Sequence, residues 1–321
     1  MKVVVTGGSG RAGEYIIAEL AAYGHEVVNA DRVPPRPIAT DGASRASATV
    51  QGGPDSSPAL FWQVDVTDYG DVVNALTGAD AVIHMAAIAA PDHMPEHQLF
   101  KINMLSNWNV LEACEVHGIR RVVMASSINA LGAGWGHNNY PPLYFPVDEA
   151  HPTRVEDAYS QSKWLGEQMA EAFVRRRHIR QIANMRFHGL WDPAAAIAHR
   201  EKGDKSDTGG RRGMGLWSWT GRHDAARACR LAIEKEFEGA EAFFINSSDT
   251  VLDIPTVAAI KREYPGVPIR KPIEGFGSAL DISKAERILG WAPVESWRDG
   301  TVRLPEPVKS RPPEYQAQWT R

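Results

Sequence analysis

A glycine-rich turn near the start of the chain is the feature that most constrains its fold. Lys2–Thr6 is a short run rich in β-branched residues, which is typical of a buried parallel strand. Glycines then follow at a G-x-x-G-x-x-G spacing as far as Gly13, and Glu14–Tyr23 has the pattern of a helix. A tight turn, a close approach to a pyrophosphate and close helix–strand packing each require a glycine, so this order predicts a dinucleotide-binding unit. The helix N-terminus would offer N–H groups and a positive dipole end to the phosphates.

Residues of this turn are therefore expected to bind the cofactor, namely Gly7, Gly10, Arg11, Ala12 and Gly13. Asp31 follows a second predicted strand, His25–Ala30, and stands 18 positions after Gly13. An acidic residue at this place would hold the adenosine ribose hydroxyls and repel a 2′-phosphate, which favours NAD. Arg32 beside it could pair with such a phosphate, so NADP stays a possible cofactor.

Two residues after the third predicted strand, Leu60–Val64, complete the expected cofactor site. Asp65 and Val66 are placed to meet the adenine. The alternative for Asp65 is an acid that caps the following helix.

Strands and helices alternate through the first 190 residues. Further strands are expected at Ala81–His84, Arg121–Ala125 and Gln181–Met185, and helices at Asp71–Leu76, His97–His117 and Glu156–Arg177. Such alternation predicts an α/β fold, a doubly wound parallel (Rossmann) sheet covered by helices on both faces, with a small C-terminal substrate lobe.

Three segments are expected along the chain. Residues 1–190 would form the NAD-binding Rossmann domain with the catalytic residues, and 191–303 a mixed substrate-binding lobe interleaved with it. Residues 304–321 carry four prolines and are expected to be an extended or disordered tail. The 34–58 stretch is predicted to be a surface loop, and Ala194–Gly215 a loop over the site. A helix at Asp224–Glu236, a strand at Ala242–Asn246 and a helix at Thr256–Glu263 complete the lobe.

The composition narrows the possible partners. A formal charge of −4 over 321 residues gives no electrostatic footprint for nucleic acid or an anionic membrane. No apolar run reaches the roughly 18 residues of a membrane span, and no signal-peptide pattern precedes the first strand. The two cysteines lie far apart, which fits a reducing compartment, so a cytoplasmic protein with a small-molecule substrate is expected. His93 and His97 have helical spacing, but Pro95 interrupts it and no metal site is expected.

Tyr159 and Lys163 form the main candidate catalytic pair. They stand four residues apart in a predicted helix, so both side chains rise from the same face. A phenol has an ordinary pKa of about 10 and is a poor acid or base near neutrality. A neighbouring ammonium would lower that pKa and make the tyrosine a usable proton relay. The alternative is a solvated pair of common surface residues.

Several further motifs occur in the order of a known family, and together they cover nearly the whole chain. Thr6–Gly13 resembles T-G-G-x-G-x-x-G, and His84–Ala87 resembles H-x-A-A after a fourth strand. Asn103 opens a helix similar to N-v-x-G-t-x-n-v-l-e-A, with Ser106 and Asn107 in place of the usual glycine and threonine. Further likenesses are Ser126–Gly132 to S-S-x-x-v-y-G, Tyr159 with Lys163, Arg186–Gly189 after a sixth strand, and Leu289–Pro293 to L-G-W-x-P.

The chain thus resembles the extended short-chain dehydrogenase/reductase superfamily, and within it the NAD-dependent epimerase/dehydratase family. The resemblance implies that Tyr159 is the general acid/base, that Lys163 lowers its pKa and holds the nicotinamide ribose, and that Ser127 hydrogen-bonds the reacting oxygen. Ser127 is preferred to Ser126 because it lies five residues before Gly132, which is the spacing of the family. The resemblance adds Ala86, Ala87, Asn103, Tyr159, Lys163 and Phe187 to the cofactor site, and Ser126, Ser127, Ile128, Asn129 and His188 to the substrate site. It also implies a homodimer built on the two long helices.

One departure from the family pattern concerns the substrate. Nucleotide-sugar epimerases carry an Arg-Asp pair in a G-x-G-x-x-x-R-D stretch, and Leu216-Trp217 stands in its place here. A diphosphate needs charged donors, so a smaller substrate is favoured. Other arginines could compensate, namely Arg186, Arg200, Arg211, Arg212 or Arg222. Four tryptophans near the expected pocket could stack on a sugar or simply pack in the lobe, namely Trp135, Trp191, Trp217 and Trp219.

Three functions follow from these residues. The leading hypothesis is an NAD(P)-dependent oxidoreductase that transfers hydride at a secondary alcohol or carbonyl carbon of a small sugar, sugar acid or polyol. The alternative is a nucleotide-sugar epimerase or dehydratase with tightly bound NAD. The third is a catalytically silent NAD(P)-sensing regulator, which retention of both Tyr159 and Lys163 disfavours.

Overall fold

A computed structural model describes residues 1–35, 59–132, 134–135, 138, 140–201 and 214–298. The predicted tail from 304 and nearly all of the predicted 34–58 loop lie outside these residues.

A seven-stranded parallel sheet forms the centre of the molecule, in the order β3-β2-β1-β4-β5-β6-β9. Its strands are β1 (Lys2–Thr6), β2 (Glu26–Asp31), β3 (Ala59–Gln63), β4 (Ala81–His84), β5 (Arg121–Ser127), β6 (Gln181–Phe187) and β9 (Gly239–Ile245). The strand order reverses between β1 and β4, and ligands of doubly wound sheets bind at the carboxyl ends of strands beside such a reversal. The predicted fold class is therefore confirmed, and the N-terminal end of each predicted strand is displaced by no more than three residues.

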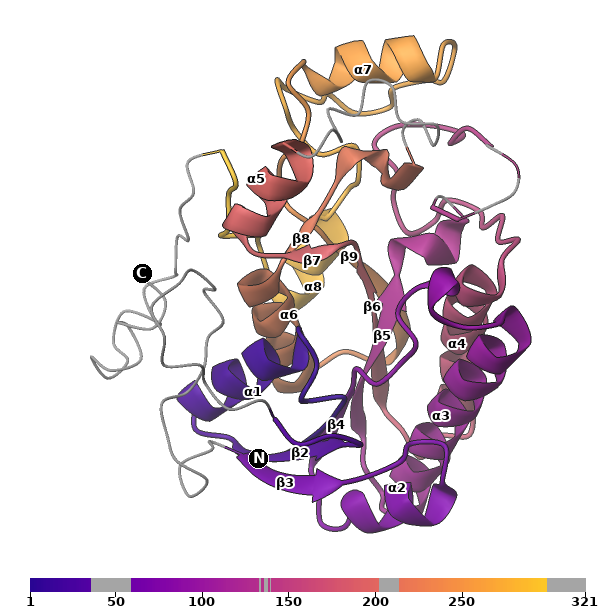
Figure 1. Cartoon of the computed structure of the whole chain (residues 1–321), viewed down its shortest axis with the longest axis vertical. Coiled ribbons are helices and arrows are strands. Elements are labelled where there is room, and N and C mark those ends of the chain that lie inside the picture. The colour runs from indigo at the N-terminus through magenta and orange to yellow at the C-terminus, as the bar shows by residue number, and fades with distance from the viewer. Residues whose placement is uncertain (36–58, 133, 136–137, 139, 202–213, 299–321) are drawn as a thin grey trace.

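Helices cover both faces of this sheet (Figure 1). One face is covered by α1 (Gly13–Ala22), α6 (Arg222–Glu234) and α8 (Ser283–Leu289). The other is covered by α2 (Tyr69–Ala75), α3 (Glu96–Val116) and α4 (Ala158–Arg175). Among the described residues, no helix is long and apolar enough to cross a bilayer.

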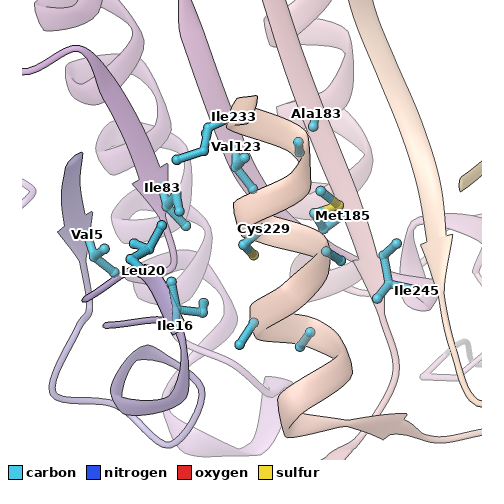
Figure 2. Packing of buried hydrophobic residues seen from close by; sticks show 14 of the residues in the cluster. Val5, Ile16, Leu20, Ile83, Val123, Ala183, Met185, Cys229, Ile233 and Ile245 are labelled. Carbon is cyan, nitrogen blue, oxygen red and sulfur yellow. The ribbon is translucent and has the colours of Figure 1, made fainter. Parts of the chain in front are cut away.

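The core on the α1–α6 side of the sheet explains why the sequences of the strands are continuous apolar runs. Val5, Val123 and Met185 project from three different strands toward Ile16 of α1 and Cys229 of α6 (Figure 2). A strand buried on both faces needs apolar side chains at every position. Both cysteines are buried and free.

The C-terminal lobe packs at the carboxyl edge of the sheet and has its own core. It includes β7 (Leu190–Trp191), α5 (Pro193–Glu201), β8 (Thr220–Gly221), α7 (Thr256–Glu263) and the 3-10 turn η3 (Met214–Trp217). The chain returns from this lobe to the main sheet, because β9, α6 and α8 all come from the 191–303 segment.

The prediction of a loop from Ala194 is wrong for its first part, which forms α5. Asp-Pro is a common start of a helix, so the sequence contains a helix-start signal at Asp192-Pro193. In the structure Asp192 accepts a hydrogen bond from the backbone N–H of Ala195 at 2.7 Å, and Pro193 is the first residue of α5. Residues 202–213 lie outside the described part of the chain.

Candidate active site

The pair Tyr159 and Lys163 lies in the first turns of α4, which begins at a well-formed cap. The Asp157 side chain accepts a hydrogen bond from the backbone N–H of Ser160 at 2.9 Å, as an N-cap should. Tyr159 is 6% exposed and Lys163 is 8% exposed, so the alternative of a solvated surface pair does not apply. The Lys163 ammonium donates to the carbonyl oxygen of Ala125 at 2.7 Å and lies 5.7 Å from the centre of the Tyr159 ring.

Ser127 joins this pair at the carboxyl end of β5. It caps the 3-10 turn η2 (Ile128–Leu131), and its hydroxyl oxygen accepts from the backbone N–H of Asn129 at 3.1 Å and from its side-chain amide at 3.3 Å. A side-chain hydrogen bond links Ser127 to Tyr159. The structure therefore brings the three predicted catalytic residues together at one sheet edge, with Asn129 orienting the serine.

The pKa values of the pair differ from the sequence expectation. Burial raises the pKa of Tyr159, and the hydrogen bond with Ser127 offsets this only in part, so the expected lowering by Lys163 is not found in this geometry. The reason is that the ammonium lies beside the ring and donates to Ala125 instead of to the phenol oxygen. Burial lowers the pKa of Lys163 to about 8.

His84 is a buried polar residue next to this site that the sequence marked only as part of a motif. Its Nδ1 lies 2.6 Å from the Thr6 hydroxyl, which ties the ends of β4 and β1 together. Burial and, to a smaller extent, the positive charge of Lys163 lower the pKa of His84 to about 3. The imidazole is therefore neutral at any ordinary pH, and the ammonium of Lys163 does not face a second positive charge.

Ser126 has a different place from the one expected. Its hydroxyl donates to Glu167 of α4 at 2.5 Å, and Arg186 of β6 donates to both oxygens of that carboxylate at 2.9 and 2.8 Å. All three side chains are buried. Adjacent residues of a strand point to opposite faces, so Ser126 faces the α4 layer. Its contact with a substrate stays a prediction, because its hydroxyl hydrogen is engaged by Glu167.

The glycine-rich turn has the geometry that a pyrophosphate site requires. Gly7 has φ +69°, and a Cβ there would lie 2.7 Å from the backbone nitrogen of Ala86. A Cβ on Gly13 would collide with the Gly7 carbonyl, so the helix packs directly against the turn. α1 begins after Ala12 without a side-chain cap, which leaves its N-terminus suited to an anionic group.

The Asp31 carboxylate holds the same turn through two hydrogen bonds. One carboxylate oxygen accepts from the backbone N–H of Ser9 at 3.0 Å, and the other accepts from that of Val33 at 3.1 Å. Each oxygen keeps a second lone pair for a ribose hydroxyl. Arg32 lies beside Asp31 and is exposed. Gly10 and Arg11 complete the turn between Gly7 and α1.

The residues predicted to meet the adenine follow β3, and a local hydrogen-bonded turn holds Asp65 there. Asp65 accepts from the Thr67 N–H at 2.9 Å and from its hydroxyl at 2.7 Å, which lowers the pKa of Asp65. The helix-cap alternative for Asp65 is wrong, because Asp68 caps α2. Val66 is buried beside it, and Ala86 and Ala87 are half-buried after β4.

The side chains of Asn103 and Phe187, both predicted to contact the cofactor, are buried. The Asn103 amide accepts from the Ile88 N–H at 2.8 Å and donates to the Ile88 carbonyl and to the Ser162 hydroxyl, each at 3.1 Å. Asn103 therefore holds the loop after β4 against α4. Phe187 is part of the core beneath α6.

Residues on the substrate side meet the lobe. Ile128 is buried in the core of the lobe, and His188 follows β6, where its Nδ1 accepts from the Gly189 N–H at 2.6 Å. Leu216 and Trp217, which replace the family's Arg-Asp pair, are buried and have φ of 55° and 57°. Among the described residues, no group of three or more His, Cys, Asp or Glu side chains is placed to hold a metal ion.

Comparison with known proteins identifies the family. The model of the NAD dependent epimerase/dehydratase family matches residues 3–191, which is more than half of the chain. The chain belongs to this family. Membership confirms the predicted family and NAD as the cofactor. Tyr159 and Lys163 lie inside the matched region.

The chain is also similar to individual proteins of known name. The chain is 30% identical over 202 residues to a 3-beta-hydroxysteroid dehydrogenase of Mycolicibacterium neoaurum, covering 59% of this chain and 48% of that protein. It is 26% identical to a putative UDP-glucose 4-epimerase of Methanocaldococcus jannaschii, covering 94% and 96%. The crystal structure of a UDP-glucose 4-epimerase of Thermotoga maritima shares the fold, with a TM-score of 0.64, 22% identity and coverage of 94% and 96%. The chain spans about half the length of the first curated relatives that it matches.

Proposed function

We propose that this protein is an NAD-dependent oxidoreductase that transfers hydride at a secondary alcohol or carbonyl carbon of a small sugar, sugar acid or polyol. The observation that carries the proposal is the buried cluster of Ser127, Tyr159 and Lys163 at the carboxyl end of β5. When bound, NAD supplies the hydride-accepting nicotinamide. NADP is the less favoured cofactor, because Asp31 repels a 2′-phosphate.

The side chains divide the proton chemistry between them. Ser127, oriented by Asn129, donates its hydroxyl hydrogen to the substrate oxygen. Tyr159 gives a proton to that oxygen in carbonyl reduction and removes it in alcohol oxidation. Because burial raises the pKa of Tyr159, the phenol is protonated at neutral pH. Reduction is thus supported at neutral pH, and alcohol oxidation is expected to accelerate as the pH rises.

The substrate is proposed to lack a nucleotide handle. Leu216 and Trp217 occupy the place of the family's Arg-Asp pair, and both side chains are buried in the core of the lobe. Neither can donate a bidentate hydrogen bond to a diphosphate. Arg186 cannot take over this role without leaving Glu167, to which it donates two hydrogen bonds.

A second candidate is a nucleotide-sugar epimerase or dehydratase in which NAD is regenerated in every turnover. The similarity to a putative UDP-glucose 4-epimerase over 94% of the chain favours it. Arg222, at the start of α6, donates a hydrogen bond to Asp192 at 3.2 Å. A diphosphate would therefore have to compete with an existing ion pair.

The assembly and location are also proposals. We propose a homodimer that pairs α3 and α4 with the same helices of a second copy, because Trp108 and Val116 of α3 are 39% and 63% exposed. The two buried free thiols, Cys114 and Cys229, fit a cytoplasmic location.

Absorbance at 340 nm tests the proposed function. Free sugars, uronates and polyols with NAD should give net NADH in the wild-type protein. Tyr159→Phe should reduce the rate about 10²–10⁴-fold, the usual contribution of a general acid/base, while NAD binding in a titration stays unchanged. Interconversion of UDP-sugars without net NADH would favour the second candidate. Normal turnover in Tyr159→Phe would contradict the catalytic assignment.

A further inference from the structure

Residues 143–154 form a segment that connects the C-terminal lobe with the turn η2, and we call this segment the strap. At the lobe, Phe145 pairs with Ile269 and Val147 pairs with Leu280 through isolated β-bridges. Two backbone hydrogen bonds of 2.7 to 2.9 Å form at each of these two strap residues. The lobe therefore holds the first half of the strap.

The second half of the strap is attached to η2, the turn that Ser127 caps. The Thr153 hydroxyl donates a hydrogen bond to the carbonyl oxygen of Ala130. The backbone N–H of Arg154 donates to the carbonyl oxygen of Leu131 at 2.9 Å. These two carbonyls belong to the last residues of η2, so the strap holds the turn on which the orientation of Ser127 depends.

The half-buried side chain of His151 connects the two halves of the strap. Its Nε2 accepts a hydrogen bond from the backbone N–H of Leu143 at 2.9 Å, and its Nδ1 lies 2.9 Å from the carbonyl oxygen of Pro152. A carbonyl oxygen only accepts, so Nδ1 carries the ring proton and Nε2 keeps a lone pair. A protonated ring donates from both nitrogens. Protonation would therefore set Nε2–H against the N–H of Leu143 and break that hydrogen bond.

The surroundings of the ring favour its neutral form. Burial is the largest influence and lowers the pKa of His151 below the ordinary 6.5, and Arg154 and Arg186 act in the same direction. The carbonyl of Pro152 and the carboxylate of Asp148 oppose this shift only in part. The ring also contacts Tyr144 and lines cavities with Tyr140 and with Glu149 of the strap, Glu167 and Glu171 of α4, Glu241 of β9 and Lys284 of α8.

We propose that residues 143–154 are an acid-sensitive strap, which releases Leu143 and loosens η2 when His151 takes up a proton. The ring bridges the two halves of the strap only while Nε2 accepts from Leu143, so the charged ring leaves the first half attached to the lobe alone. The orientation of Ser127 then becomes less fixed in acid. The strap is a property of the fold and requires no turnover, so it goes beyond the proposed function.

Amide hydrogen–deuterium exchange of the full chain, followed by mass spectrometry at about pH 8 and pH 5, tests this proposal. At each pH the exchange rate of peptides from the strap and η2 is divided by that of the same peptides unfolded, which removes the intrinsic pH dependence. His151→Gln keeps an acceptor oxygen for the N–H of Leu143 but does not titrate. Glu149→Gln is the matched control, since Glu149 is a second titrating group of the strap, and its contact with the N–H of Phe244 needs only an acceptor oxygen.

The relative exchange of the strap and η2 should rise about tenfold from pH 8 to pH 5 in wild type and in Glu149→Gln, the effect of losing one hydrogen bond. It should stay unchanged in His151→Gln. A second readout is the ¹⁵N spectrum of labelled histidines, in which the ring signals absent from His151→Gln should show the Nδ1–H tautomer at pH 8 in wild type.

Four results would each overturn the proposal: unchanged relative exchange in wild type, the same rise in His151→Gln, no rise in Glu149→Gln, or an Nε2–H tautomer of His151 at pH 8. If His151→Gln fails to fold, the exchange of wild type and of Glu149→Gln still decides between the outcomes. None of these measurements involves turnover, so their result is independent of the proposed function.

Discussion

Replacing Lys163 with methionine is expected to stabilise the fold at neutral pH while it removes a proposed catalytic group. The ammonium is 8% exposed, and burial lowers its pKa to about 8 from an ordinary 10.5. This difference of about 2.5 corresponds to roughly 3 kcal/mol of free energy that folding loses by burying the charge. Methionine has a similar length and no charge, but it gives up the hydrogen bond to Ala125, worth about 1 kcal/mol. At pH 7 the variant should therefore be more stable by about 2 kcal/mol.

The stability advantage of Lys163→Met over wild type should shrink as the pH rises. Below pH 8, Lys163 is charged in the folded and in the unfolded state, so the full cost of burial is present. As the pH rises above about 8, the folded protein releases the proton while the unfolded chain keeps it up to about 10.5, and the wild-type free energy of unfolding rises. By pH 9.5 about 2 kcal/mol of the cost is relieved, so wild type and variant should then be about equally stable.

Urea unfolding of both proteins at pH 7 and pH 9.5 measures this change. Other titrating groups are present in both proteins, so their contributions largely cancel in the difference. Lys235→Met at an exposed position is the control and should show no change of the difference with pH. A Lys163→Met variant whose stability relative to wild type is the same at both pH values would refute the reasoning.

Two further predictions concern the turn and the buried ion pair. Gly7→Ala should cost about 1–3 kcal/mol more in urea unfolding than Gly118→Ala, because both glycines have positive φ but only at Gly7 would the new Cβ meet backbone, at Ala86; equal losses would show that the close approach is unimportant. Glu167→Ala should lower the free energy of unfolding by about 3–5 kcal/mol by leaving the buried Arg186 unpaired, whereas Glu167→Met combined with Arg186→Met should be within about 1 kcal/mol of wild type. A double variant as unstable as the single one would contradict this account.

Local sequence patterns were sufficient where the chemistry is local. The β-branched run before Gly7, the glycine spacing and the acid at Asp31 lie within one strand–turn–helix–strand unit, and the structure forms that unit where the sequence predicts it. The spacing of Tyr159 and Lys163 likewise needed only one helix.

Tertiary partners were not predictable in the same way. A motif places Ser126 and Ser127 side by side, but the hydroxyl of Ser126 bonds to Glu167, a residue 41 positions away on another element. Whether the pKa of Tyr159 is raised or lowered depends on the direction of the Lys163 ammonium. The ammonium donates a hydrogen bond to the carbonyl of Ala125, and this contact sets its direction. The alternation rule of strands could have separated the two serines, whereas the partner of the ammonium required coordinates.

The buried face of α4 links these observations. Tyr159, Lys163 and Glu167 follow one another at intervals of four residues, so they form a row along one side of the helix. The first two face the end of β5 near Ser127, and the third binds β5 and β6 through Ser126 and Arg186. A shift of α4 along its axis would break the Glu167 contacts and misplace Tyr159 at the same time. The ion pair thus sets the register of the helix that carries the proposed acid/base, and this explains why a charge pair can be retained in a place where apolar residues would stabilise the fold equally well.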